Sequence, residues 1–143
     1  MNLKLDGKNV IITGGSDGIG KETARIMAEE GANVIIFARN IENLNKTKDS
    51  IKSNTGKIVD IYSVDVKNEK NVKESVTKVV EKYGNIDILV NNAGTSSAHP
   101  IMNITDEIMN DDLGTKLFGA IYMTQAVVPS MKKNKKGSIV NIT

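Results

Sequence analysis

The sequence contains no cysteine, which excludes a disulfide framework and favours an intracellular protein. Its aromatic side chains are three tyrosines and two phenylalanines, and 19 basic residues barely outnumber 17 acidic ones. So few stacking side chains and so even a charge balance argue against a nucleic-acid-binding protein. Residues 1–8 lack the apolar core of a signal peptide, and no run approaches the roughly 20 apolar residues that cross a bilayer. We therefore expect a cytoplasmic protein with neither a nucleic-acid nor a membrane partner.

The stretch from Asn9 to Gly20 organises the rest of the chain. An apolar run breaks into glycines and continues with helical spacing, which predicts a strand, a turn and a helix. Gly14, Gly18 and Gly20 would let backbone amides approach a phosphate where a Cβ would collide, and the positive end of the helix points there. The pattern predicts a site for a nucleotide pyrophosphate. A structural turn is the alternative, because the spacing is G-x-x-x-G-x-G and a lone glycine motif is weak evidence.

The remainder of the chain alternates between apolar runs and segments with helical spacing. The runs predict four further strands, at residues 33–38, 58–64, 86–90 and 137–142. Strands that alternate with helices imply parallel pairing and right-handed crossovers. The sequence therefore predicts an α/β fold with a doubly wound parallel sheet of Rossmann type, five strands of which are present. Neither a repeat nor a linker appears, so residues 1–143 are expected to form one domain.

Two helices have apolar faces that we expect to pack on the sheet. The stripe of the first is Ile19, Ala24, Ile26, Met27 and Ala28, and Gly31 provides a left-handed cap. A long helix is expected to begin at an N-cap, Thr105, and Pro129 is expected to bend or loosen its last turns. Its expected inner face is Ile108, Leu117, Ile121, Thr124, Val128 and Met131.

Small or polar residues follow four of the expected strands. These strand ends are the glycine turn, residues 38–40, Asp65 with Val66, and residues 91–94. In a doubly wound sheet, ligands bind beyond the carboxyl ends of the strands, where the strand order reverses. The convergence of four such ends on one edge predicts a dinucleotide site.

The chain also resembles the short-chain dehydrogenase/reductase family. TGGSDGIG at 13–20 is similar to the family's cofactor motif, NNAG at 91–94 to its fourth-strand motif, and VDV at 64–66 to a third. The long helix and the segment GSIVNIT also fall where the family places them. The resemblance implies an NAD(P)-dependent oxidoreductase that acts on a small carbonyl or alcohol and forms a homo-oligomer when intact.

The resemblance also implies which residues contact the cofactor. The glycine turn would hold the pyrophosphate, Asp65 would accept a hydrogen bond from adenine, and residues 92–94 would line the ribose and ring. For Asp65, a role in stabilising the turn after its strand is the alternative. The full expected set is Gly14, Ser16, Asp17, Gly18, Ile19, Gly20, Arg39, Asn40, Asp65, Val66, Asn92, Ala93 and Gly94.

The end of the second expected strand bears on the choice of cofactor. NAD-binding domains usually place an acid there, about 20 residues after the glycines, to bind the ribose hydroxyls. Here the residues are Ala38 and Arg39, and an arginine can form a charge-assisted pair with a 2′-phosphate. Asp17 favours NAD instead, because many NADP-using relatives carry a basic residue near that point of the glycine turn. The sequence favours NADP, with NAD as the alternative.

Two departures from the family limit the catalytic assignment. At the position of Lys116, relatives commonly have an asparagine that helps to hold a proton-relay water. The lysine either replaces this asparagine as a charged donor or faces solvent with no role. The family's catalytic serine and Tyr-x-x-x-Lys motif would follow the last residue, and Tyr62, Tyr83 and Tyr122 have no lysine four residues later.

We therefore assign no catalytic residue. No cluster has metal-ligand spacing, and His99 receives no role. The expectation is the cofactor-binding part of a reductase, incomplete at its C-terminus and inactive alone. A non-catalytic nucleotide-binding or regulatory module is the alternative.

Overall fold

The computed structural model describes residues 2–95 and 98–143. Its centre is one sheet of five parallel strands in the order β3-β2-β1-β4-β5. The strands are β1 Asn9–Thr13, β2 Asn33–Ala38, β3 Asp60–Ser63, β4 Ile88–Asn91 and β5 Ser138–Asn141. The order runs outward in both directions from β1, so the predicted doubly wound sheet is confirmed. Its switch point lies between β1 and β4.

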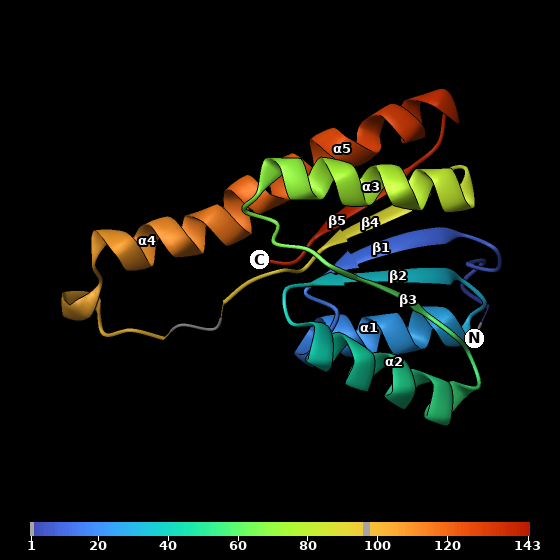
Figure 1. The fold of residues 1–143 in the computed structure, drawn as a ribbon, viewed down its shortest axis with the longest axis horizontal. Helices are drawn as coiled ribbons and strands as arrows, with labels where there is room; N and C mark the ends of the chain where they lie inside the picture. The colour runs from blue at the N-terminus through green and yellow to red at the C-terminus, as the bar shows by residue number, and fades with distance from the viewer. Residues whose placement is uncertain (1, 96–97) are drawn as a thin grey trace.

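Helices cover both faces of the sheet (Figure 1). One face carries α1 and α2, the other carries α3 and α5, and α4 projects away from the body. The helices are α1 Gly18–Glu29, α2 Ile41–Thr55, α3 Glu69–Tyr83, α4 Asp106–Leu113 and α5 Gly119–Lys133. A 3₁₀ turn, Ile101–Asn103, precedes α4, and a π-helical turn, Gly114–Phe118, joins α4 to α5. The predicted long helix is therefore continuous but contains an irregular turn.

The core has two halves because side chains alternate across the sheet. Ile11 and Ile35 point to the face under α3 and α5, whereas Val10 and Val34 point to the face under α1 and α2. All four are buried. Strands enclosed on both faces read as continuous apolar runs, which is why these strands were recognisable in the sequence.

The helix ends follow the local sequence. Gly31, Gly56 and Gly84 follow α1, α2 and α3 with φ of +89°, +70° and +84°, a conformation that favours glycine. Asn40 and Asn68 cap the starts of α2 and α3, each side chain accepting a backbone N–H three residues later.

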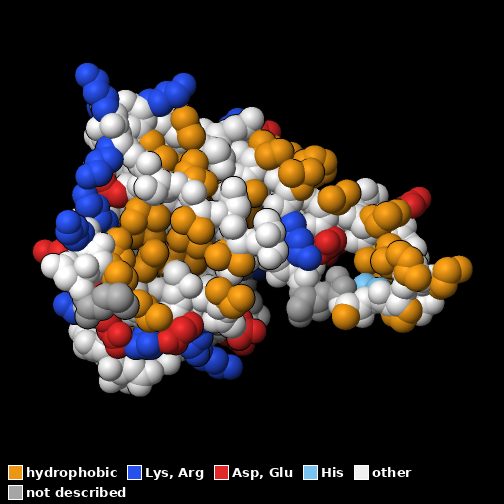
Figure 2. All heavy atoms as spheres, turned by 180° about the vertical axis from the view of Figure 1, so that it is seen from behind, with side chains coloured by type: hydrophobic (Ala, Val, Ile, Leu, Met, Phe, Trp, Pro, Cys, Tyr) orange, Lys and Arg blue, Asp and Glu red, His pale blue; other side chains and the backbone are white. Residues whose placement is uncertain are grey.

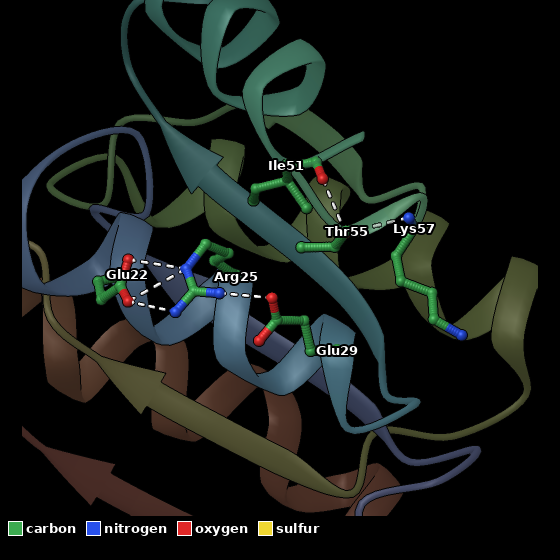
Figure 3. A network of polar contacts seen from close by, with 6 residues as sticks. All are labelled: Glu22, Arg25, Glu29, Ile51, Thr55 and Lys57. Carbon is green, nitrogen blue, oxygen red and sulfur yellow. Dashed lines mark hydrogen bonds and ion pairs between the residues drawn. The ribbon is translucent and has the colours of Figure 1, made fainter. Parts of the chain in front are cut away.

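Polar contacts on α1 and at the end of α2 are drawn in Figure 3. Arg25 binds Glu22 at 2.6 Å and Glu29 at 2.5 Å, one turn away in each direction along α1. The Thr55 hydroxyl donates to the Ile51 carbonyl at 2.7 Å in the last turn of α2. Ion pairs on a solvated helix face contribute only about 0.3–0.5 kcal/mol each, so this network supports α1 without determining the fold.

The buried face of α1 differs from the predicted one. Ile19 is 65% exposed and Ile26 is 37% exposed, whereas the buried positions are Gly20, Ala24 and Ala28. These three small residues recur every four positions and form a smooth stripe against the sheet. Ala24 and Ala28 are thus buried as predicted, whereas Ile19 and Ile26 are not, because α1 packs through its smallest side chains.

The buried face of the long helix also differs. Leu117 and Ile121, predicted to be internal, are 48% and 41% exposed, while Met123 and Val127 are buried; Met131 is buried as predicted. The π-helical turn changes the number of residues per turn and so shifts the phase of everything after it. A regular 3.6-residue spacing extended from Thr105 therefore selects the wrong face. The helix continues through Pro129 to Lys133.

Asp60 ties β3 to the end of α3. Its Oδ2 accepts from Lys82 Nζ at 2.5 Å and from the Tyr83 hydroxyl at 2.6 Å. Burial alone would raise the pKa of Asp60, but these two hydrogen bonds lower it, and burial together with Asp60 raises the pKa of Tyr83. A carboxyl whose pKa is lower in the folded state stabilises the fold above its unfolded pKa of about 3.9, and that contribution is lost as the pH falls through the folded pKa.

Asp60→Asn is therefore expected to lower the free energy of unfolding at pH 7 by about 1 kcal/mol and to flatten its decline below pH 4. Urea unfolding between pH 7 and pH 3 measures both effects. Asp49→Asn, which removes an exposed carboxylate of α2, is the matched control. If the free energy of unfolding declined equally below pH 4 in wild type and in Asp60→Asn, the role assigned to Asp60 would be wrong.

Candidate functional site

The carboxyl ends of the five strands lie along one edge of the sheet in the order set by the topology. Residues after β3, β2, β1, β4 and β5 thus succeed one another as Asp65, Arg39, Gly14, Asn92 and Ile142. Hydrogen bonds join neighbouring ends: the Ser63 hydroxyl donates to the Arg39 carbonyl at 2.9 Å and Gly14 N–H donates to the Phe37 carbonyl at 2.8 Å. The four strand ends singled out in the sequence do converge on one edge.

A groove of about 1030 Å³ opens at this edge beside the switch point. It brings together seven of the predicted site residues: Gly14, Asp17, Gly18, Ile19, Asn92, Ala93 and Gly94. Residues of the long helix form its other wall, among them Lys116, Leu117 and Ile121. The remaining predicted residues, Ser16, Gly20, Arg39, Asn40, Asp65 and Val66, lie outside this lining.

The three motif glycines have different surroundings. Gly18 has φ of +50°, and a Cβ there would meet nothing within 4 Å. A Cβ on Gly14, where φ is +65°, would lie 2.9 Å from the Ala93 Cα, and one on Gly20 would lie 2.4 Å from the Asn92 Nδ2. Gly18 thus leaves open space at the start of α1, whereas Gly14 and Gly20 are required by the close approach of the β4 end. The motif alone predicts the same role for all three glycines.

Thr13 and Asn92 lock the glycine turn to the end of β4. The buried Thr13 hydroxyl accepts the backbone N–H groups of Asn92 and Ala93, both at 3.0 Å. The Asn92 side chain donates to the carbonyls of Thr13 and Gly14 at 3.2 and 3.1 Å. The Asn92 amide nitrogen therefore serves the turn, and Ala93 and Gly94 complete the groove beyond it. The sequence analysis missed Thr13, although a threonine before the first glycine was the available signal.

Asp17 places a negative charge at the mouth of the groove. It caps α1, and its Oδ1 accepts the Gly18 N–H at 2.8 Å. A carboxylate in this position satisfies an amide that an anion could otherwise use. Ser16 is not among the residues that line the groove, and its carbonyl accepts from the Thr47 hydroxyl at 3.0 Å.

The ends of β2 and β3 form the other part of the edge. Arg39 is exposed, and its guanidinium makes no hydrogen bond or ion pair within residues 2–95 and 98–143. Asp65 Oδ1 accepts the Lys67 N–H at 3.0 Å, so the turn-stabilising alternative holds for one of its oxygens. Val66 is buried, and a Cβ on Gly119 would lie 2.6 Å from its Cγ2, so its side chain belongs to the core. Asn40 faces solvent as the α2 cap.

Lys116 lies on the groove wall and is ion-paired. Its Nζ binds Asp112 Oδ1 at 2.9 Å, and the same oxygen accepts from the Thr95 hydroxyl at 3.1 Å. The hydrogen bond from Lys116 lowers the pKa of Asp112, with a smaller contribution from Thr95. The Lys116 side chain is 54% exposed and its ion pair is with a residue one turn earlier, so both alternatives for it stay open.

Other candidate groups contribute little at this edge. His99 is exposed, and Ser96 and Ser97 lie outside the described residues. Within the described ranges, no group of three His, Asp or Glu side chains could hold a metal ion. Every helix in the same ranges is too short or too polar to span a bilayer.

Comparisons with known proteins agree with this geometry. The short chain dehydrogenase family model matches residues 8–143. The chain is 41% identical over 141 residues to the 3-oxoacyl-acyl-carrier-protein reductase FabG of Thermotoga maritima, a match that covers 99% of this chain and 57% of the relative. It is 34% identical over 134 residues to a 3-ketodihydrosphingosine reductase of Bacteroides thetaiotaomicron, with 94% of this chain and 46% of that protein covered.

Solved structures show the same arrangement. L-sorbose reductase from Gluconobacter frateurii, complexed with NADPH and L-sorbose, has a TM-score of 0.89 and 35% identity, covering 99% of this chain and 54% of its own. NAD⁺-bound xylitol dehydrogenase has a TM-score of 0.90 and 34% identity, covering 96% and 53%. The chain thus spans about half the length of these relatives. The family match over residues 8–143 and the shared fold establish that this chain belongs to the short-chain dehydrogenase family.

Proposed function

We propose that the protein is an NADP-preferring oxidoreductase that transfers a hydride between the cofactor and a carbonyl/alcohol pair. The present chain supplies the cofactor-binding residues. The single observation that carries the proposal is the row of strand ends. It sets an exposed cation, an open glycine turn and a small-residue strand end one after another along one edge. An extended dinucleotide fits such a row because its parts differ in the same order: phosphate-bearing ribose, pyrophosphate and flat ring.

The residues present fit such a cofactor. Gly18 leaves open space at the start of α1, where first-turn amides lack partners inside the helix and favour an anion. Ala93 and Gly94 have no bulk to block a flat ring in the groove. When bound, the nicotinamide accepts or donates the hydride.

The chain's own contribution is binding and orientation. The Thr13 hydroxyl and the Asn92 amide hold the glycine turn against β4, so the pyrophosphate end and the ring end of the site keep one relative position. One oxygen of Asp65 is used by its own turn, which leaves the other to accept from the adenine amine. Holding reactants in one geometry is among the largest catalytic effects that binding residues provide.

The preference for NADP rests on Arg39. A 2′-phosphate near this guanidinium would gain a charge-assisted hydrogen bond, and no acid stands at Ala38 to bind a ribose diol instead. Asp17 opposes any anion at the groove mouth, but it acts on both cofactors alike because both carry the pyrophosphate. Relatives with bound NADPH and with bound NAD⁺ are both known, so the local residues carry the choice.

Arg39→Ala is expected to lower the ratio of NADP to NAD affinity by about tenfold, since hydrogen bonds to charged groups contribute roughly 1.5–3 kcal/mol and this side chain is exposed. Calorimetric titration of each variant with NADP and with NAD measures the ratio. Ala38→Asp is expected to move the preference further toward NAD by repelling the phosphate.

Lys57→Ala is the control for general loss of positive charge, because Lys57 is an exposed cation beyond the end of α2. It is expected to leave the ratio unchanged. An unchanged ratio in Arg39→Ala would refute the assigned preference, and a wild-type chain that binds neither nucleotide would refute the proposed function.

A further inference from the structure

Three side chains interact beside the groove, and two of them, Thr95 and Lys116, line it. Asp112, in the last turn of α4, accepts through one oxygen from Lys116 on the π-helical turn and from Thr95 beyond β4. The two donors come from segments far apart in the chain, both of which line the groove, at 2.9 and 3.1 Å. The long helix and the segment after β4 are thus joined through a single carboxylate oxygen. We call Thr95, Asp112 and Lys116 the bracket.

The stem of Lys116 adds a packing contact to this polar one. A Cβ built on Gly94 would lie 3.4 Å from the Lys116 Cε and 3.8 Å from its Cγ, which is ordinary van der Waals distance. The aliphatic part of the lysine therefore covers Gly94, a residue that is exposed and has no side chain of its own to anchor it. Between the lock at Asn92 and the bracket at Thr95, the segment is held at both ends.

The π-helical turn explains why this lysine reaches the groove. The turn Gly114–Phe118 departs from α-helical spacing, and the Thr115 hydroxyl donates a hydrogen bond to the Asp111 carbonyl at 3.1 Å. Single π-helical turns inside α-helices are often retained at functional sites. Here the turn places the half-exposed Lys116 on the groove wall while its neighbours Gly114 and Thr115 are buried.

We propose that Lys116 is a positioning residue for the nicotinamide half of the cofactor, acting through Asp112 and Thr95 on residues 93–95. The proposal rests on the proposed function, because it takes the groove to be the cofactor site. The bracket restricts the conformations of residues 93–95 before the cofactor binds. The conformational entropy that is lost on binding is therefore smaller, and binding is tighter.

The first test is Lys116→Met, which keeps most of the stem and removes the ammonium. NADPH, followed by its fluorescence on binding, is expected to bind about twofold more weakly, in line with the worth of one partly exposed ion pair between residues one helical turn apart. Hydrogen exchange at the amides of Gly94 and Thr95, measured without ligand, is expected to accelerate. Lys116→Arg, which retains the charge, is expected to restore both.

A double-mutant cycle separates the bracket from a general charge effect. If Lys116 acts through Asp112, then Asp112→Asn weakens NADPH binding and the double variant with Lys116→Met binds no more weakly than the weaker single variant. Lys73→Met is the matched control, since Lys73 forms a similar one-turn pair with Glu69 at 2.6 Å on α3, away from this groove. It is expected to leave NADPH affinity unchanged.

The outcomes distinguish this proposal from the proposed function. Wild-type NADPH binding that Lys116→Met leaves unchanged, with the melting temperature also unchanged, would overturn the positioning role alone. Additive losses in the double variant would also overturn it, because Lys116 would then act independently of Asp112. Failure of the wild type to bind NADPH would overturn both proposals.

Discussion

Alanine at Gly20 is expected to abolish measurable NADP binding and to destabilise the fold by about 3 kcal/mol. The added Cβ would lie 2.4 Å from the Gly14 carbonyl oxygen and 2.4 Å from the Asn92 Nδ2. The first of these is backbone, so relief requires the glycine turn itself to move. Overpacking of this kind costs about 1–3 kcal/mol, and loss of the two Asn92 hydrogen bonds adds about 1 kcal/mol each.

A loss of binding is expected beside the loss of stability, because a displaced turn no longer presents its amides to a phosphate. We expect NADP affinity to fall at least about a hundredfold, measured by calorimetry well below the melting temperature. Gly56→Ala is the matched control: its φ is +70° and a Cβ there meets nothing within 4 Å. That variant is expected to lose about 1 kcal/mol of stability through strain and no affinity. Equal affinities for Gly20→Ala and wild type would show that the turn tolerates a Cβ.

Valine at Thr13 is expected to lower the free energy of unfolding by about 2–4 kcal/mol. The change keeps the branched shape but removes the oxygen that accepts the N–H groups of Asn92 and Ala93. The Thr13 side chain is buried, so water cannot readily replace the lost acceptor, and each unsatisfied donor costs about 1–3 kcal/mol. Urea unfolding, with NADP titration of the folded variant, measures the effect on the fold and on the site.

Thr77→Val provides the comparison for Thr13→Val. The Thr77 hydroxyl also bonds to backbone, donating to the Lys73 carbonyl at 2.8 Å, but on the exposed face of α3. Its loss is expected to change stability by less than about 0.5 kcal/mol. If the two threonine variants were equally stable, the lock between β1 and β4 would contribute nothing beyond side-chain shape.

The order of strands and helices was predictable because local chemistry and burial agree. Runs such as residues 33–38 are enclosed on both faces and carry no polar side chain after Asn33, and glycines with positive φ follow α1, α2 and α3. The fold class and the edge that carries the site follow from this alternation alone. The predicted site residues Gly14, Gly18 and Ala93 indeed share one groove.

Other features depend on tertiary contacts that no periodicity reveals. The long helix has apolar residues around its circumference, so Leu117 and Val127 are equivalent in sequence although only the latter is buried. The π-helical turn Gly114–Phe118, which lies between the start of α4 and Val127, is not marked by the apolar spacing. The difference between Gly18, which has open space around it, and Gly20, which Asn92 approaches closely, likewise depends on a residue more than 70 positions away. It could not be inferred from the motif.

The lock between Thr13 and Asn92 also ties nucleotide binding to the order of folding. These residues are 79 positions apart, and two strand-helix units separate β1 from β4 along the chain. Contacts of such long range carry a large loop-closure entropy and form late. The site is therefore complete only when the central sheet is complete, and a nucleotide that binds it selects the folded chain by mass action. At a hundred times its dissociation constant, such a ligand adds about 2.7 kcal/mol to the free energy of unfolding, so the concentration of nucleotide would set the fraction of chains in which β1 and β4 are paired.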